Sequence, residues 1–178
     1  MVEMSIYGVS FDLVGKQPIV LLKTAEGNRY LPIWIGHSEA AAILMKLQGA
    51  TAPRPLTHDL LVNMLGELDV EIVRVTVTEL RENTFHASIT IAQNGNEVEI
   101  DSRSSDAIAV AVRAQVPIFA ADEVIEESAI EMEGDEVNEE EIVDQFKRFL
   151  DEVSAEDFIE AEVDGDAEEA ETDDEEDR

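Results

Sequence analysis

The alternation of apolar and polar residues is most regular in the middle of the chain. Every second position is largely apolar over Val70–Leu80, and the alternation continues over Thr84–Ala92 and at Val98 and Ile100. Polar turns separate these runs, and the second turn contains Gly95, which suits a tight reversal of the chain. Alternation broken by short turns is typical of antiparallel strands with one buried face. We therefore predict a three-stranded β-meander.

The first 35 residues predict a further group of strands. Residues 2–14 are mostly apolar at strand spacing, with a bulge expected near Gly8. Ile19–Thr24 is predicted to form a second strand. A turn at Glu26–Asn28 then leads into a third strand over Tyr30–Ile35.

The spacing of apolar residues changes to a helical one after Gly36. A helix is predicted to begin at His37–Glu39 and to end at Gly49, with one buried face made by Ala40, Ile43, Leu44 and Leu47. The loop Pro53–Pro55 cannot continue a helix, because proline lacks the backbone N–H.

A second helix is expected directly after this loop. Thr57 is the predicted N-cap, and the apolar positions predict one buried face, made by Leu60, Leu61, Met64, Leu65 and Leu68.

A third helix follows the meander. Ser104 or Ser105 is suited to cap it, and the small residues of Ala107–Ala114 indicate close packing against a neighbour. Val116–Phe119 is then expected to return as a short extended segment. Together these elements predict an α+β fold with mixed or antiparallel sheets, a central β-meander and packed helices.

Charge divides the chain into a balanced body and an acidic C-terminal part. Residues 1–121 hold 9 Lys/Arg and 14 Asp/Glu, a net charge of −5, whereas residues 122–178 hold 3 and 28, a net charge of −25. We expect one domain over residues 1–127 and an acidic linker with a helix over 128–158. A disordered acidic tail is expected over 159–178.

The helix within the acidic part is predicted from a capping-box start at Asn138–Glu141. Its apolar residues recur at helical spacing and would form one face: Ile142, Val143, Phe146, Phe149, Leu150 and Val153.

Composition excludes several classes of protein. The chain has no cysteine, so disulfides and thiolate metal sites are excluded. No apolar run approaches the length that a membrane span needs, and no secretory signal pattern is present, so a cytoplasmic protein without membrane contact is expected. The glycine-rich and serine motifs of nucleotide-binding proteins and serine hydrolases are absent, so no nucleotide cofactor is expected.

Polar side chains capable of chemistry gather at three junctions between elements. His37 and Glu39 open the first helix; Arg54, His58 and Asp59 surround the start of the second; Asp101, Arg103 and Asp106 precede or begin the third. Hydrolysis of a phosphodiester needs a group that activates water and groups that hold the phosphate, often with a carboxylate-bound divalent metal. Asp59, Asp101 and Asp106 are candidate ligands for Mg²⁺ or Mn²⁺, His58 is a candidate general base, and Arg54 and Arg103 are candidate phosphate ligands.

Each of these residues also has a structural explanation. His58 and His37 are at helix starts, where histidine is common on the surface. Asp101 and Asp106 can stabilise a turn and a helix N-terminus. Arg54 and Arg103 can pair with these acids and tie loops to the sheet.

Three motifs resemble the bifunctional nuclease (BFN) domain family. They stand here as Leu31–Glu39, Pro53–Leu61 and Asp101–Ala109, the last followed by Ala111, Arg113 and Pro117-Ile118. The resemblance covers roughly residues 2–127, and Phe149–Phe158 is similar to an extension of actinobacterial members. It implies an α+β fold and a nuclease activity on RNA and DNA.

The leading hypothesis is therefore a nuclease that hydrolyses RNA or single-stranded DNA. His58, Asp59, Asp101 and Asp106 would be catalytic, with Asp59, Asp101 and Asp106 as metal ligands. The substrate would be bound by Arg54, Arg103, His37 and Glu39. A homodimer and a basic partner for the acidic tail are further expectations. The alternative is a non-enzymatic module that binds a ligand or a protein, which the absence of a basic surface on the body favours.

Overall fold

The computed structural model describes residues 1–12 and 17–131, and within them it confirms the α+β fold. Eight strands form one mixed sheet in the spatial order β6-β5-β4-β7-β1-β2-β3-β8. The strands are β1 Val2–Asp12, β2 Gln17–Thr24, β3 Arg29–Trp34, β4 Glu71–Arg81, β5 Thr84–Gln93, β6 Asn96–Arg103, β7 Ile118–Ala120 and β8 Ile130–Glu131. The helices are α1 His37–Leu47, α2 Thr57–Glu67, α3 Ser104–Ala114 and α4 Asp122–Ser128.

Two antiparallel groups make up most of the sheet, as the alternation predicts. The meander β4-β5-β6 is one group, and β1-β2-β3 is the other, with the expected irregularity of β1 between Ile6 and Gly8. Strand β7 joins them, because it pairs parallel with β4 and antiparallel with β1. A strand of three residues thus connects the two halves into one sheet.

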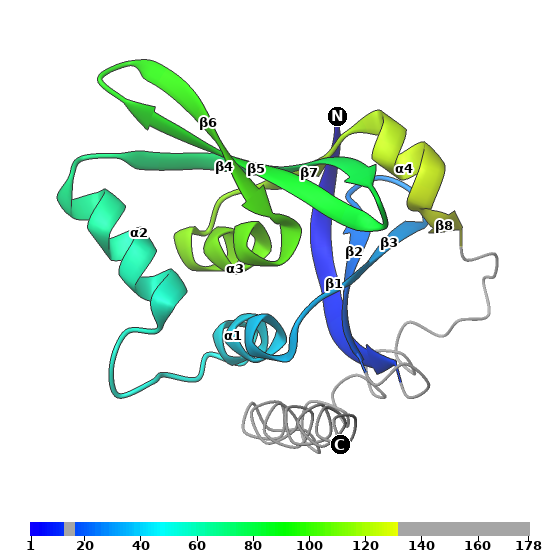
Figure 1. Ribbon diagram of the computed structural model, residues 1–178, viewed down its shortest axis with the longest axis horizontal. Coiled ribbons are helices and arrows are strands. Elements are labelled where there is room, and N and C mark those ends of the chain that lie inside the picture. Colours follow the sequence, from blue (N-terminus) through cyan, green and yellow to red (C-terminus); the bar gives the residue numbers. More distant parts are fainter. Residues whose placement is uncertain (13–16, 132–178) are drawn as a thin grey trace, which may run out of the picture.

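The core lies between the sheet and the helices. In Figure 1 the β1–β3 and β4–β6 parts of the sheet are set at a steep angle to each other, and α1 and α3 lie inside that angle. Side chains from both parts are fully buried there, among them Leu22, Leu31, Val75 and Ile108. The alanine-rich sequence of α3 allows this close approach, and both α1 and α2 pack against it.

Helix α2 departs from the prediction. Leu60, Leu61, Met64 and Leu68, predicted to be buried, are 53%, 41%, 53% and 61% exposed, and no residue of α2 is buried. The helix rests on the core through Val62 and Leu65 instead. The apolar residues of α2 cover a wider arc than the surface that the described residues offer, so these four side chains are left uncovered.

The helix starts also differ slightly from expectation. The N-cap of α2 is Leu56 rather than Thr57, and that of α3 is Arg103 rather than Ser104 or Ser105. Asp59 takes over the capping role in α2, since its carboxylate accepts a hydrogen bond from the Leu56 amide at 2.9 Å.

The short elements α4 and β8 have no counterpart in the prediction. The predicted amphipathic helix and the acidic tail lie outside the described residues. Among the described residues, no helix is both long and apolar enough to cross a membrane.

Candidate functional site

The first turns of α1, α2 and α3 meet at a pocket of about 350 Å³. An apolar wall is formed by Ala41, Met45 and Leu56, and the polar residues that line the pocket are Ser38, Glu39, Thr57, His58, Arg103 and Asp106. All three predicted junctions therefore contribute to one site. The positive ends of three helix dipoles also lie at this pocket, an arrangement that favours a bound anion.

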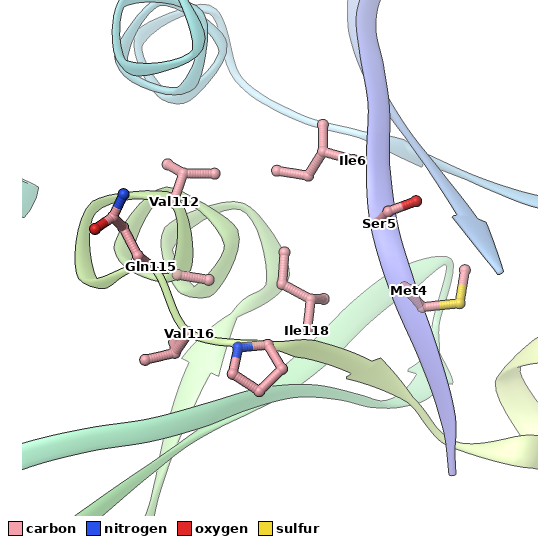
Figure 2. Close-up of a pocket in the computed structure, with 9 residues that line it drawn as sticks. Met4, Ser5, Ile6, Val112, Gln115, Val116 and Ile118 are labelled. Carbon is pink, nitrogen blue, oxygen red and sulfur yellow. The ribbon is translucent and has the colours of Figure 1, made fainter. Parts of the chain in front are cut away.

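A second pocket shows why the first is the candidate for chemistry. It measures about 230 Å³ and lies between β1, the end of α3 and β7 (Figure 2). Ile6 and Val112 point toward each other across it, and none of its lining residues is titratable. Its walls offer apolar contacts but no group that could transfer a proton.

His58 and Asp106 form a pair at the polar pocket. Nε2 of His58 lies 3.0 Å from Oδ1 of Asp106, and the histidine side chain is 14% exposed. Because a carboxylate only accepts hydrogen bonds, this contact places the proton of the neutral ring on Nε2. Nδ1 then carries the lone pair, and it has no hydrogen-bond partner among the described residues. The pair thus has the geometry of an oriented general base.

Arg103 extends this pair into a chain of alternating charges. Its Nε donates to Oδ2 of Asp106 and its terminal nitrogen to Oε1 of Glu39, each at 2.7 Å. The hydrogen bond to Asp106 raises the pKa of Arg103 above its ordinary value. Burial alone would raise the pKa of Asp106, but the hydrogen bonds from Arg103 and His58 outweigh it and lower that pKa. At neutral pH the pocket therefore holds an ionised Asp106 beside a cationic Arg103.

Glu39 is held in place by local geometry. Ser38 donates its hydroxyl to Oε2 at 3.1 Å, and the carboxylate folds back over Gly36, the N-cap of α1. A side chain at Gly36 would collide with Oε2 of Glu39. The glycine is thus what allows the carboxylate of Glu39 to reach Arg103.

Arg113 is a residue that the site prediction missed. Its side chain is only 4% exposed, and its Nε donates to Oδ1 of Asp59 at 2.7 Å. Its two other nitrogens donate to the carbonyls of Ala109 and Ala42, each at 3.0 Å. One guanidinium therefore ties α1, α2 and α3 together beneath the pocket. A single arginine among the small and apolar residues of Ala107–Ala114 was the signal in the sequence.

The remaining predicted residues lie apart from the pocket or serve the scaffold. Asp59 is engaged by Arg113 and the Leu56 amide, which together lower its pKa although burial raises it. Asp101 is exposed and lies on the opposite face of β6 from Ile100, whose strand partner Ile89 is in the core. Arg54 is exposed in its loop, and His37 begins α1 without lining the pocket.

The structure does not bring the three predicted metal ligands together. Asp59 and Asp106 are bound to different arginines, and Asp101 points elsewhere. Across residues 1–12 and 17–131, no group of three or more His, Cys, Asp or Glu side chains is arranged to hold a metal ion. The described residues therefore do not form a cation site made of protein ligands alone.

The fold and pocket define an α+β protein with a histidine–aspartate pair where three helix starts meet. The sequence pattern of the bifunctional nuclease domain matches residues 20–133, and the chain belongs to the bifunctional nuclease domain family. This confirms the resemblance. An uncharacterized protein of Mycobacterium tuberculosis (strain H37Rv) is 41% identical over 163 residues, which cover 88% of this chain and 97% of that protein.

Plant proteins are more distant relatives. Bifunctional nuclease 1 of Oryza sativa subsp. japonica is 29% identical over 103 residues, 56% of this chain and 31% of the rice protein. Bifunctional nuclease 1 of Arabidopsis thaliana is 28% identical over 105 residues, 57% of this chain and 32% of that protein. The similarity is thus to about a third of each plant protein, and it supports assignment to a nuclease family.

Proposed function

We propose that the chain hydrolyses phosphodiester bonds in RNA or single-stranded DNA at the polar pocket. The observation that carries this proposal is the His58–Asp106 pair, in which the second ring nitrogen remains available to a ligand. His58 would take a proton from the attacking water through Nδ1 as the new P–O bond forms, and the imidazolium would give that proton to the leaving oxygen as its bond to phosphorus breaks. Asp106 would fix the ring orientation and stabilise the imidazolium that results.

The phosphate would be bound by the helix starts and by Arg103. Backbone N–H groups at helix N-termini and a guanidinium are both suited to phosphate oxygens. The Arg103 side chain is 65% exposed despite its two carboxylate partners, so further oxygens can approach it. Glu39 would keep the guanidinium oriented. The exposed Arg54 lies two residues before Leu56 of the pocket wall and is placed to contact a longer strand.

A divalent metal would enter this proposal together with the substrate. Mg²⁺ is commonly held by one or two carboxylates together with substrate phosphates and water. Glu39 and Asp106 are the pocket carboxylates that could contribute to such an ion. Because both already contact Arg103, the metal-free acid–base pair is the primary hypothesis.

The first test is cleavage of labelled single-stranded RNA and DNA by the full-length chain, with Mg²⁺, with Mn²⁺ and with EDTA. Replacement of His58 by Ala or Asp106 by Asn should lower kcat by about 10²–10⁴-fold, the usual contribution of general acid–base catalysis. His86→Ala is the matched control, since His86 lies on β5 and contacts Arg81 instead. Asp101→Asn should retain activity if the pocket alone is responsible, whereas loss of activity would restore Asp101 as a metal ligand.

A second candidate function is a module that binds a small ligand or a protein without catalysis. One observation favours it: Arg103 and Arg113 are already paired with carboxylates, so little positive charge remains for a phosphate. If the wild type cleaves RNA and DNA no faster than the His58→Ala variant does, the nuclease proposal is rejected. Binding of an uncharged nucleoside by the wild type, measured by calorimetry and weakened in His58→Ala, would then assign the pocket to ligand recognition.

A further inference from the structure

The exposed side of α2 carries large apolar side chains with no described residue covering them. Leu60, Leu61, Met64 and Leu68, together called the α2 stripe, are each 41–61% exposed and recur at helical spacing. No charged residue lies between them, since the two acids of the helix, Asp59 and Glu67, are outside the stripe. Contiguous exposed apolar patches of this kind mark interaction surfaces.

We propose that the α2 stripe is the interface of a homodimer, in which α2 packs antiparallel against α2 of a second copy. A twofold interface uses the same patch on both subunits, so the patch has to be complementary to itself. An uncharged stripe meets this requirement, because burying it against its own copy leaves no unpaired charge. This matters because the chain has a formal net charge of −30, so long-range repulsion opposes association and favours an interface without charges of its own.

The charges at the two ends of α2 select the antiparallel orientation. Arg54 is exposed just before the helix, whereas Glu67 and Asp69 are exposed at its other end. An antiparallel pair brings Arg54 of each copy toward Glu67 and Asp69 of the other. The two helix dipoles then point in opposite directions, which is their favourable arrangement side by side. A parallel pair would place like charges together at both ends.

Other occupants fit the stripe less well. The segment 132–178 of the same chain offers the apolar face predicted over residues 142–153, but it also holds 23 Asp/Glu and 3 Lys/Arg, so it would add acidic residues to the acidic end of α2. Self-association through the exposed strand β6 is disfavoured too, because Glu97 and Glu99 would then face the same acids of the other copy.

Cross-linking gives a direct test, because the natural chain has no cysteine. Met64 lies near the middle of the stripe and would be close to its own copy across the twofold axis. The Met64→Cys variant of the full-length chain should form a covalent dimer on mild oxidation. Val98→Cys is the matched control, since Val98 is 54% exposed on β6, away from the stripe, and should cross-link poorly.

Sedimentation equilibrium over a concentration series measures the interface itself. The wild type should reversibly dimerise, and the Leu61→Glu/Met64→Glu variant should raise the dissociation constant at least about a hundredfold, because charge would be buried at the centre. Val98→Glu should leave it unchanged. Arg54→Glu should weaken the dimer, and adding Glu67→Arg should restore it.

A wild type that stays monomeric at every concentration would overturn the proposal, as would a dimer unaffected by the two glutamates. A monomer in which an introduced thiol at position 64 resists alkylation would assign the stripe to residues 132–178 instead. Circular dichroism of each variant separates loss of association from loss of folding.

Discussion

Single residues in this protein decide whether the charged groups of the pocket can meet. Gly36 is the clearest case, because its missing side chain leaves room for the carboxylate of Glu39. Its backbone conformation is an ordinary extended one, with φ of −73°. The requirement for glycine is therefore one of space rather than of backbone freedom.

Replacement of Gly36 by Ala should push the Glu39 carboxylate away from Arg103. The colliding atom ends a flexible side chain, so the stability cost should be small, about 0.5–1 kcal/mol, mostly from the poorer N-cap. A double-mutant cycle with Glu39→Gln, measured by urea unfolding, checks this, since the second substitution should cost nothing further in the Ala background. Gly66→Ala is the matched control. That position has open space and lies within α2, so the change should stabilise the protein by about 0.5–1 kcal/mol.

At the scale of elements, the sequence predicts the strands and helices better than it predicts their contacts. The meander, the β1 irregularity and three helices follow from periodicity because backbone and side-chain patterning are local properties. The parallel pairing of β7 with β4 and the exposure of α2 depend on tertiary packing, which a pattern in one segment does not contain. The hypothesis from the sequence already assigns His58, Arg103 and Asp106 to one site, but the contact of His58 with Asp106 and the bridge from Arg103 to Glu39 depend on tertiary packing.

The clamp made by Arg113 illustrates a contact that the pattern could not supply. Arg113→Met should destabilise the protein by about 2–4 kcal/mol, because Asp59 and two carbonyls lose their donor. The value lies below that for a fully buried pair, since the Asp59 side chain is 34% exposed. Arg113→Lys should lower the free energy of unfolding by less than Arg113→Met does, because lysine keeps the charge. Some stability should still be lost, since lysine lacks the forked geometry of the guanidinium.

Denaturant unfolding of these variants measures the clamp. Arg81→Met is the control, since Arg81 pairs with Glu79 at the surface and its loss should cost no more than about 1 kcal/mol. Equal effects at Arg81 and Arg113 would contradict the role of Arg113 as the link among the three helices.

On the scale of the whole molecule, acid should test the network of carboxylates. The pKa values of Asp59 and Asp106 are lower in the folded state than in the unfolded state. Each residue therefore stabilises the fold at a pH above its pKa in the unfolded chain, which is about 3.9. This stability is lost as the pH falls through the lower folded pKa. The unfolding temperature of the wild type should therefore exceed that of Asp106→Asn at neutral pH. This difference should narrow below about pH 4. Protonation of the other acidic residues lowers the net negative charge of both proteins alike, so it does not change this difference. A difference in unfolding temperature that is independent of pH would contradict the assignment.

The attachment of α2 has a consequence for the motion of the molecule. A helix with no buried residue, held mainly by Val62, Leu65 and the Arg113–Asp59 pair, has a smaller free energy of local opening than the strands around it. We expect that such an opening would separate His58 from Asp106 while α3 and the sheet stay folded. The fraction of molecules with an assembled acid–base pair is thus set by how firmly α2 is docked. Anything that covers the outer side of this helix raises that fraction without touching the pocket.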